Sequence, residues 1–348
     1  MCARLPSLGW RENFLRAAEL RKPEFIPCRL IPTEPVWNIH RDELRDLALR
    51  YPAIHLSKPG TSLRSPRAYI DQFGCKWHFC REGDYGYVVE NPLSSWSRLR
   101  DLNIPDPEDG LLVHAGPLMP WEEVYKGLRT AREAGELVRG SFEYGFLFER
   151  LSYLRGYSNL LVDFLRKPPE LFDLTERLTQ YFMELVERLL RFDGLDAVFF
   201  GDDLGNQDRM PMAKSTFREV LYPCYRRIFR SVREAGVHVY MESDGHMVEV
   251  ADDLIDAGVT ILRLQDRVNG LENIAAKCKG RICVDIDLDR QFIMPFGTPE
   301  QVRTHVEHVV DILDSRKGGL MLGAELYLPA PMNNVEAALE TMVKCMWY

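Results

Sequence analysis

The feature that most constrains the fold of this chain is a repeated alternation of short apolar segments with longer amphipathic stretches. Short apolar runs without polar alternation are typical of strands buried on both faces of a parallel sheet. Eight such runs occur, at residues 25–31, 111–115, 137–141, 197–200, 237–241, 260–264, 282–286 and 320–323. The stretches between them, such as 169–190 and 299–313, place apolar residues three and four positions apart, and Thr298 is placed to cap the latter. Strands alternating with helices predict an α/β fold, a (β/α)8 TIM barrel, with an open doubly wound sheet as the alternative.

Residues from about 32 to 105 interrupt this alternation and predict an insertion into the barrel. Within them, 69–79 and 85–90 are rich in aromatic and β-branched residues and flank the turn-forming segment 81–84. This pattern predicts a β-hairpin that covers one end of the barrel. The insertion is too short for an independent domain. We therefore expect a single domain over residues 1–348, with an N-terminal extension and this hairpin insertion.

Composition excludes several classes of protein. The chain has 348 residues, a net charge of −8 and 46% hydrophobic residues, as expected for a globular protein. The sequence has no run of about 18 apolar residues, which a membrane span requires. Its first residues also lack an apolar signal core, so we expect a cytoplasmic protein. The acidic charge without a Lys/Arg cluster argues against nucleic-acid binding. The eight cysteines lack the spacing of zinc or redox pairs and are expected to be reduced.

Acidic and polar side chains follow the predicted strands directly. Because catalytic groups of a TIM barrel lie at the carboxyl ends of its strands, these positions form the candidate site. They are Asp202, Asp203, Asn206, Gln207, Glu242, Asp244, His246, Gln265, Asp266, Asp285, Asp287, Glu325 and Tyr327. Some of them, such as Asp203, Asn206 and Asp287, are equally expected to cap turns or helices. Several acids at one barrel mouth repel one another, so a cation, a cationic substrate or raised pKa values are expected there.

Glu242, Asp244 and Glu325 are the predicted metal ligands. Glu242 and Asp244 are two residues apart, so they face the same side of an extended strand end, and His246 follows them. Carboxylates with one imidazole suit zinc or another divalent metal, and we expect these four residues to carry the chemistry. In the alternative interpretation, His246 is not a ligand and only covers the mouth of the loop. The predicted substrate-binding residues are Asp202, Gln207, Gln265 and Tyr327, with Phe142 and Tyr144 as an aromatic wall.

Five motifs in order give the chain a resemblance to the uroporphyrinogen decarboxylase superfamily along nearly its whole length. They are WRENFLRAA to KPEFIP at 10–27, FGDDLG at 200–205, SDGH at 243–246, FGTPEQVR at 296–303 and PMNNVEA at 331–337. This resemblance implies the same (β/α)8 barrel. The decarboxylases of the superfamily carry an Arg-rich loop after the first strand and a Phe-Ser-Asp-Ile motif. This chain has PTEPVW at 32–37 instead and lacks the second motif, so porphyrinogen decarboxylation is not expected.

The chain is more similar to the branch of corrinoid-dependent methyltransferases. Members that act on coenzyme M hold zinc with a His-x-Cys pair and a later Cys, where this chain has ESD at 242–244 and AEL at 324–326. An oxygen-ligated metal suits an ether oxygen better than a thiol. The resemblance thus implies an O-demethylase-type methyltransferase. It would move a methyl group between a small substrate, such as a methoxylated aromatic compound, and the corrinoid (methylcobalamin) of a partner protein.

Two other functions stay open at this stage. A decarboxylase or lyase of another small acid needs a cationic group to hold the substrate carboxylate, and Arg139, Arg150 and Arg263 are the candidates near the strand ends. A non-catalytic binding barrel is the third possibility, although such a barrel has no need of a ring of acids.

Overall fold

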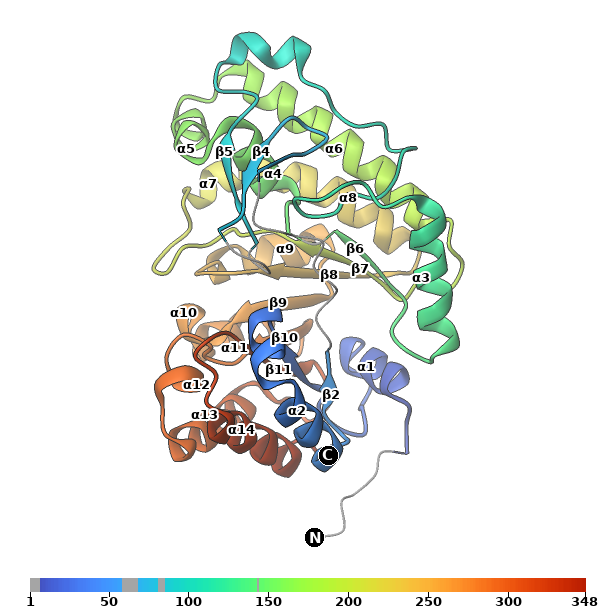
Figure 1. Cartoon of the computed structure of the whole chain (residues 1–348), viewed down its shortest axis with the longest axis vertical. Helices are drawn as coiled ribbons and strands as arrows, with labels where there is room; N and C mark the ends of the chain where they lie inside the picture. Colours follow the sequence, from blue (N-terminus) through green and yellow to red (C-terminus); the bar gives the residue numbers. More distant parts are fainter. Residues whose placement is uncertain (1–6, 58–67, 81–84, 143) are drawn as a thin grey trace. The chain divides into compact units, whose positions relative to one another are not determined.

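The computed structural model describes residues 7–57, 68–80, 85–142 and 144–348. The chain divides into two compact units, and each is described by itself. Unit 1 comprises Met1–Thr61 and Thr260–Tyr348, and unit 2 comprises Ser62–Val259. Unit 1 therefore combines the two ends of the chain, which are blue and orange to red in Figure 1.

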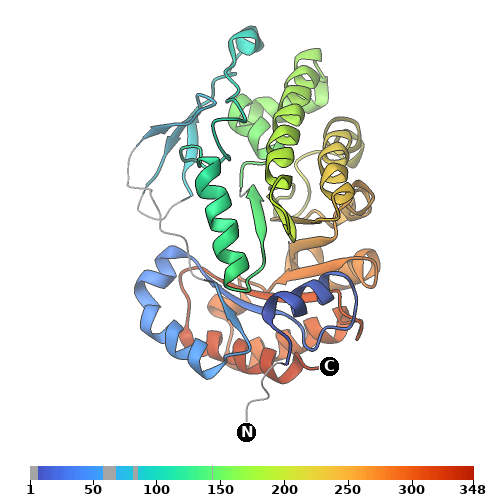
Figure 2. The same ribbon diagram turned by 90° about the vertical axis from the view of Figure 1, so that its right-hand side faces the viewer.

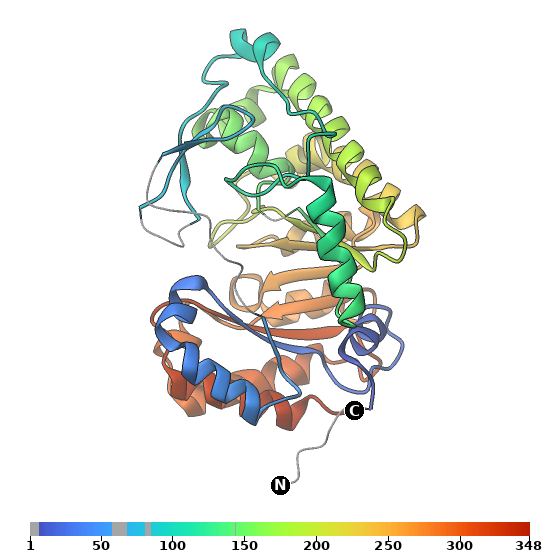
Figure 3. The same cartoon turned by 45° about the vertical axis from the view of Figure 1, so that its right-hand side comes forward.

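Unit 1 is built on five parallel strands in the order β2-β1-β11-β10-β9. The strands are β1 (Cys28–Pro32), β2 (His55–Leu56), β9 (Ile261–Gln265), β10 (Cys283–Asp287) and β11 (Leu320–Leu326). The helices are α1 (Trp10–Ala18), α2 (Glu34–Arg50), α10 (Asp266–Asn269), α11 (Leu271–Cys278), α12 (Ile293–Phe296), α13 (Pro299–Leu313) and α14 (Met332–Cys345). Strands β9 and β10 are buried along their whole length, and α13 packs against α14 (Figure 3). The continuous apolar runs of the sequence thus become fully covered strands.

Unit 2 contains three parallel strands in the order β8-β7-β6 and a separate antiparallel sheet, β3-β4-β5. The strands are β3 (Tyr69–Ile70), β4 (Lys76–His78), β5 (Tyr87–Glu90), β6 (Arg139–Phe142), β7 (Ala197–Gly201) and β8 (His238–Ser243). The helices are α3 (Trp121–Glu133), α4 (Leu147–Arg155), α5 (Tyr157–Arg166), α6 (Pro169–Leu190), α7 (Lys214–Thr216), α8 (Tyr222–Glu234) and α9 (Ala251–Ala257). There are also two 3-10 helices, η1 (Trp96–Asp101) and η3 (Val248–Val250), and a π-helix, η2 (Phe217–Leu221). The long helix α6 packs along α8 (Figure 2).

Eight parallel strands alternate with helices, as the (β/α)8-barrel prediction requires. Seven of the eight apolar runs form strands, and the prediction for 111–115 is wrong. There, Leu111 forms only an isolated antiparallel bridge with Met119. The eighth strand is β2, which the sequence does not reveal because it has two residues, both half-buried. The helix α2 was also not predicted; along its 17 residues only Val36, Leu44 and Leu47 are buried, so its apolar stripe is weak.

The predicted hairpin is present as β4 and β5, whose connecting residues 81–84 lie outside the described residues. Strand β3 adds a third strand that was not predicted. The turn from β3 to β4 is held by the carboxylate of Asp71, which accepts hydrogen bonds from the backbone N–H of Phe73 (3.0 Å) and of Cys75 (2.8 Å) and from the indole of Trp77 (3.0 Å). The ring of Trp77 lies 4.8 Å from that of Tyr153 on α4, so the small sheet packs on this helix.

Two helix predictions are confirmed at both ends. Helix α6 spans Pro169–Leu190 and α13 spans Pro299–Leu313. Thr298 caps α13, because its hydroxyl accepts from the N–H of Gln301 (3.3 Å) and the Gln301 side chain accepts from the N–H of Thr298 (2.8 Å). In the described part of the chain, the cysteines form no disulfide. None of the helices in the described ranges is long and apolar enough to cross a membrane.

Candidate functional site

Asp202 follows β7 in unit 2 and holds the start of α4. Its two carboxylate oxygens accept hydrogen bonds from the backbone N–H of Phe148 (2.7 Å) and of Glu149 (2.8 Å), and the phenol of Tyr225 donates to it as well. These are donors that the first turn of a helix otherwise leaves without partners. The residue is fully buried. We therefore assign Asp202 a positioning role, and its capping bonds place Glu149 next to it.

The loops that follow β7 and β8 meet through two glycines. A Cβ atom on Gly245 would lie 2.2 Å from the carbonyl oxygen of Gly205, and one on Gly205 would lie 2.5 Å from the backbone nitrogen of His246. Only glycine permits this approach. It is fixed by a hydrogen bond from the N–H of His246 to the carbonyl of Asn206 (2.7 Å). The contact brings Asp203 to Asp244, whose backbone N–H donates to the Asp203 carboxylate.

Five carboxyl groups gather at these strand ends and are called the acid cluster: Glu149, Asp202, Asp203, Glu242 and Asp244. Burial, followed by the charges of Asp244, Asp202 and Glu242, raises the pKa of Asp203 to about 8. Burial also raises the pKa of Asp202 to about 6, against the lowering effect of its hydrogen bonds. Burial and the neighbouring Asp203 and Asp202 raise the pKa of Glu149 well above its usual value. Asp203 therefore keeps its proton near neutral pH.

Tyrosine side chains border the acid cluster. The phenol of Tyr144, just after β6, donates to Oε1 of Glu242 (3.3 Å), and that of Tyr153 donates to Glu149 one turn earlier on α4. The ring of Tyr85 lies 6.0 Å from that of Tyr144. We call Tyr85, Tyr144 and Tyr153 the tyrosine wall. His114 lies behind it, with its ring nitrogens 3.0 Å from the carbonyl of Tyr144 and 3.1 Å from that of Tyr85.

The strand ends of unit 1 carry a different arrangement, in which arginines and acids alternate. Arg263 on β9 lies within 3.5 Å of Asp285, Asp287 and Glu325. Its guanidinium passes Gly323, where a Cβ atom would lie 2.6 Å from Nη1. Further ion pairs join Arg29 to Asp285 and Arg290 to Asp287 (3.2 Å) and Glu325 (2.7 Å). This arginine–acid network therefore has three positive and three negative groups.

Glu325 belongs to the arginine–acid network and is charged there. Its Oε2 accepts from Arg263 (3.0 Å) and Arg290 (2.7 Å), and its Oε1 accepts from the phenol of Tyr327 (3.0 Å). Burial opposes ionisation of Glu325, but Arg290 and Arg263 outweigh it and lower the pKa. Because both oxygens are engaged by donors, Glu325 does not fit the role of a metal ligand in this arrangement. Within the described ranges, no group of three or more His, Cys, Asp and Glu side chains is arranged to hold a metal ion.

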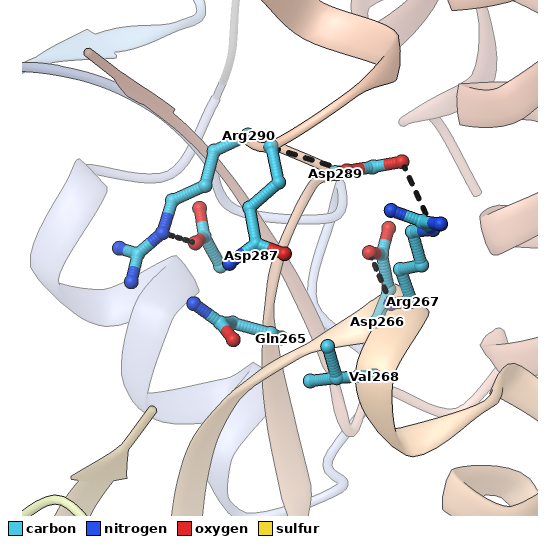
Figure 4. Close-up of a pocket in the computed structure, with 8 residues that line it drawn as sticks. Gln265, Asp266, Arg267, Val268, Asp287, Asp289 and Arg290 are labelled. Carbon is cyan, nitrogen blue, oxygen red and sulfur yellow. Dashed lines mark hydrogen bonds and ion pairs between the residues drawn. The ribbon is translucent and has the colours of Figure 1, made fainter. Parts of the chain in front are cut away.

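A small cavity lies beside the arginine–acid network at the ends of β9 and β10 (Figure 4). Gln265, Asp287 and Arg290 line it together with residues of α10. Its volume of about 10 Å³ leaves room for about one water molecule. The cavity is thus too small for a substrate in this form of unit 1.

Comparison with known proteins identifies the family. The family model described as uroporphyrinogen decarboxylase (URO-D) matches residues 68–345. The chain belongs to the uroporphyrinogen decarboxylase family. Among solved structures, a methyltransferase from Methanosarcina mazei matches with a TM-score of 0.70 at 13% identity, covering 97% of this chain and 99% of that one. This likeness confirms the predicted (β/α)8-barrel fold.

One further solved structure resembles this uroporphyrinogen decarboxylase family member only weakly. An endo-1,4-beta-xylanase from Caldicellulosiruptor owensensis has a TM-score of 0.35 at 11% identity, covering 64% of this chain and 93% of that one. A comparison with curated proteins found no match.

The residues predicted from the sequence fall in different places in this family member. Glu242, Asp244 and Tyr144 lie in or beside the acid cluster of unit 2, and Gln265, Glu325 and Tyr327 lie at the strand ends of unit 1. Phe142 is buried among Phe146, Phe182 and Phe200, so it is a core residue. Gln207 is exposed in the loop after β7, and His246 is half-buried beside Gly205.

Sequence reasoning missed Glu149, Tyr153 and Arg290. Glu149 and Tyr153 are four residues apart on α4 and so share one face of the helix, but the sequence does not show that this face meets Asp202. Arg290 is in the loop after β10, a position at which the sequence gives no periodic signal. Asp287 lies three residues before Arg290, and this spacing could have indicated the ion pair between them.

Proposed function

We propose that this protein is a methyltransferase that moves a methyl group between a small methoxylated substrate and a corrinoid carried by a partner protein, as an O-demethylase. Membership of the uroporphyrinogen decarboxylase family and the full-length likeness to a methyltransferase support the methyl-transfer part. The acid cluster supports the ether as methyl donor. It is the observation that carries the proposal.

Cleavage of a methyl ether requires a proton at the oxygen that leaves. When the C–O bond breaks, its electron pair stays on the oxygen, and protonation makes that oxygen a better leaving group. The partner's reduced corrinoid supplies the nucleophile that takes the methyl group. Asp203 holds a proton at neutral pH because burial raises its pKa to about 8, and burial also raises the pKa of the neighbouring Glu149, so either carboxyl is suited to donate a proton to the oxygen. A carboxyl group of ordinary pKa would already have lost its proton.

The tyrosine wall gives the substrate a place beside the acids. Its rings offer faces and edges for an aromatic substrate. Tyr144 joins wall and acids, because its phenol donates to Glu242. We assign Glu242 and Tyr144 to orienting the substrate, with Asp244 and His246 in the adjoining loop.

A divalent metal such as zinc, bound by Glu242, Asp244 and Glu325, stays a prediction of the sequence. Glu325 is engaged by two arginines and a tyrosine, so we derive no step through a metal. Elemental analysis of the purified protein tests this prediction directly.

The decarboxylase alternative needs a cationic group ready for a substrate carboxylate. Arg263 lies among three carboxylates, Arg150 pairs with Asp71 (3.2 Å), and Arg139 lies over the rings of Phe199 (4.5 Å) and Tyr240 (6.0 Å). Each of the three candidate arginines is thus engaged within the protein. These contacts favour methyl transfer over decarboxylation.

The test is to mix the purified protein with a reduced corrinoid protein and a panel of methoxylated aromatic compounds. Methyl transfer changes the absorbance of the corrinoid, and a demethylated phenol accumulates. Glu149→Gln and Asp203→Asn, which cannot donate a carboxyl proton, should each slow transfer, by about a hundredfold for the residue that acts as the acid. Failure of transfer with every methoxylated donor, and with thiols as acceptors, would contradict the proposal.

A further inference from the structure

His114 is held between two backbone carbonyl groups. Its Nδ1 atom lies 3.0 Å from the carbonyl oxygen of Tyr144, and its Nε2 atom lies 3.1 Å from that of Tyr85. A carbonyl oxygen only accepts hydrogen bonds, whereas a neutral imidazole carries a proton on just one of its two nitrogens. In the neutral ring, a nitrogen lone pair would therefore face one of the two carbonyls. An imidazolium, which carries a proton on both nitrogens, satisfies both contacts.

The surroundings of His114 also suit a positive charge. The side chain is buried, and the rings of Trp77 and Tyr153 lie 5.1 and 6.0 Å from its own. Electron-rich rings and the negative ends of two carbonyl dipoles favour the charged form of histidine. Burial alone opposes that charge, so the two hydrogen bonds are what offsets the loss of water.

The charged and titratable groups that face His114 come from the tyrosine wall and from α4. A Cβ atom on Gly145 would lie 3.7 Å from Nδ1 of His114 and 2.9 Å from Nη2 of Arg150. Arg150 brings a like charge, which Asp71 offsets at 3.2 Å. Glu149 reaches the same glycine, because its carboxyl group accepts from the N–H of Gly145 (2.7 Å). An imidazolium therefore lies among acids and phenols as well as beside one paired arginine.

The loop that carries His114 has a fixed shape. Leu111 and Met119 exchange two backbone hydrogen bonds of 2.8 Å, which close the loop. Ala115, the next residue after His114, has a φ of 48°, in the left-handed region that is unfavourable for a residue with a Cβ atom. Such a conformation persists where surrounding contacts impose it, and it is frequent at functional sites. The segment 111–115, predicted as a strand, thus places one imidazole between two tyrosines.

The two contacts of His114 join parts of the tyrosine wall that are far apart in the sequence. Tyr85 precedes β5, whereas Tyr144 follows β6 and donates to Glu242. Their rings lie 6.0 Å apart. Loss of one proton from the imidazolium removes one of the two hydrogen bonds and sets a lone pair against a carbonyl oxygen. The two tyrosines are then no longer joined through His114.

We propose that His114 is a positioning residue that works as an imidazolium, whose two N–H groups join the backbone of Tyr85 to that of Tyr144. This link fixes the two rings beside the acid cluster. That the rings receive the methyl donor rests on the proposed function, but the charged state of His114 and the link do not. Because His114 acts through the tyrosines, it affects the affinity for the substrate and not the rate of the chemical step.

The first experiment is a nitrogen-15 NMR spectrum of the whole protein, labelled at its histidines and recorded at about pH 7, within the range in which histidine titrates. His114 should show a proton on each ring nitrogen. Its signals are identified by their loss in His114→Gln, or by their contacts with the Trp77 ring if that variant does not fold. A single protonated ring nitrogen would overturn the proposal.

The second experiment separates positioning from chemistry. His114→Asn and His114→Gln each keep an amide donor, but neither can carry the charge. Both should raise KM for the neutral donor 4-methoxytoluene by about tenfold, the effect of one lost hydrogen bond to a charged group, and change kcat by less than about twofold. KM of the unaltered protein should rise above about pH 8, and KM of the variants should not. His308→Gln, at an exposed histidine of α13, is the matched control.

Unchanged KM in both folded variants would overturn the positioning role. If no methoxylated donor is demethylated, the proposed function fails, and amide hydrogen exchange then tests the link by itself. Exchange at residues 85–90 should be about tenfold faster or more in His114→Gln than in the unaltered protein and in His308→Gln. Equal exchange in all three proteins would overturn the proposal.

Discussion

The phenol of Tyr144 donates a hydrogen bond to Oε1 of Glu242 at 3.3 Å and so joins the segment after β6 to the end of β8. Tyr144 follows β6, and Glu242 lies near the end of β8; these strands lie on either side of β7 in the parallel sheet of unit 2. The carboxyl ends of parallel strands meet at one edge, which is where barrel enzymes place their chemistry. The pair therefore links the tyrosine wall to the acid cluster.

Glu242→Gln should reduce methyl transfer while the protein stays folded. The amide still accepts the bond from Tyr144 but removes one negative charge beside Asp203. We expect a loss of about tenfold to a hundredfold in turnover and little change in melting temperature. Parallel assays of Glu187→Gln, at an exposed acid of α6, provide the control. Full activity of Glu242→Gln would exclude the residue from the site.

Glu325→Ala should act on stability. The change leaves Arg263 and Arg290 buried with one carboxylate fewer. Removing one partner of a buried ion pair typically costs about 3 kcal/mol or more. Urea denaturation of both variants should show a larger loss in the free energy of unfolding for Glu325→Ala than for Glu242→Ala. Equal, small losses would mean that the network in unit 1 is not as described.

Asp202→Ala should destabilise the start of α4. The variant loses the acceptor for the N–H groups of Phe148 and Glu149 and for the phenol of Tyr225. The expected loss in the free energy of unfolding is about 2 kcal/mol, as for a strong helix cap. Amide hydrogen exchange at residues 147–150 should accelerate. Unchanged exchange there would contradict the capping role.

The pH dependence of stability follows from the raised pKa of Asp203. A carboxyl whose pKa is near 4 in the unfolded chain and about 8 in the folded one favours the folded state when protonated. Its contribution is complete below about pH 4 and is lost as the pH rises towards 8. The fall in unfolding free energy over this window should be shallower in Asp203→Asn than in the unaltered protein. Denaturation at a series of pH values measures this, and identical slopes would contradict the shift.

The sequence predicted most of the fold because the strands are continuous apolar runs. Runs such as 197–200 and 282–286 leave little choice but a doubly covered strand. Strand β2 was not predicted because its two half-buried residues show no hydrophobic pattern. The strand predicted at 111–115 is wrong because its apolar residues pack without forming a hydrogen-bonded strand pair beyond the isolated bridge of Leu111.

The candidate site was predicted only in part, because its charge balance depends on residues far apart in the chain. Glu242 and Glu325 look alike as acids after strands, yet Glu325 meets Arg263 and Arg290, while Glu242 meets Tyr144. Glu149 lies beside Asp202 because the Asp202 carboxylate caps its helix. Such pairings follow from tertiary structure and leave no local trace in the sequence.

The measurement that tests the central claim most directly is transfer of an isotopically labelled methyl group. The protein is incubated with a reduced corrinoid protein and a methoxylated aromatic compound whose methyl group is labelled, and the corrinoid is analysed by mass spectrometry. The account predicts label on the corrinoid, an equivalent amount of demethylated product, and a slower reaction with Glu242→Gln. Label that stays on the donor, or that moves equally fast without this protein, would contradict it.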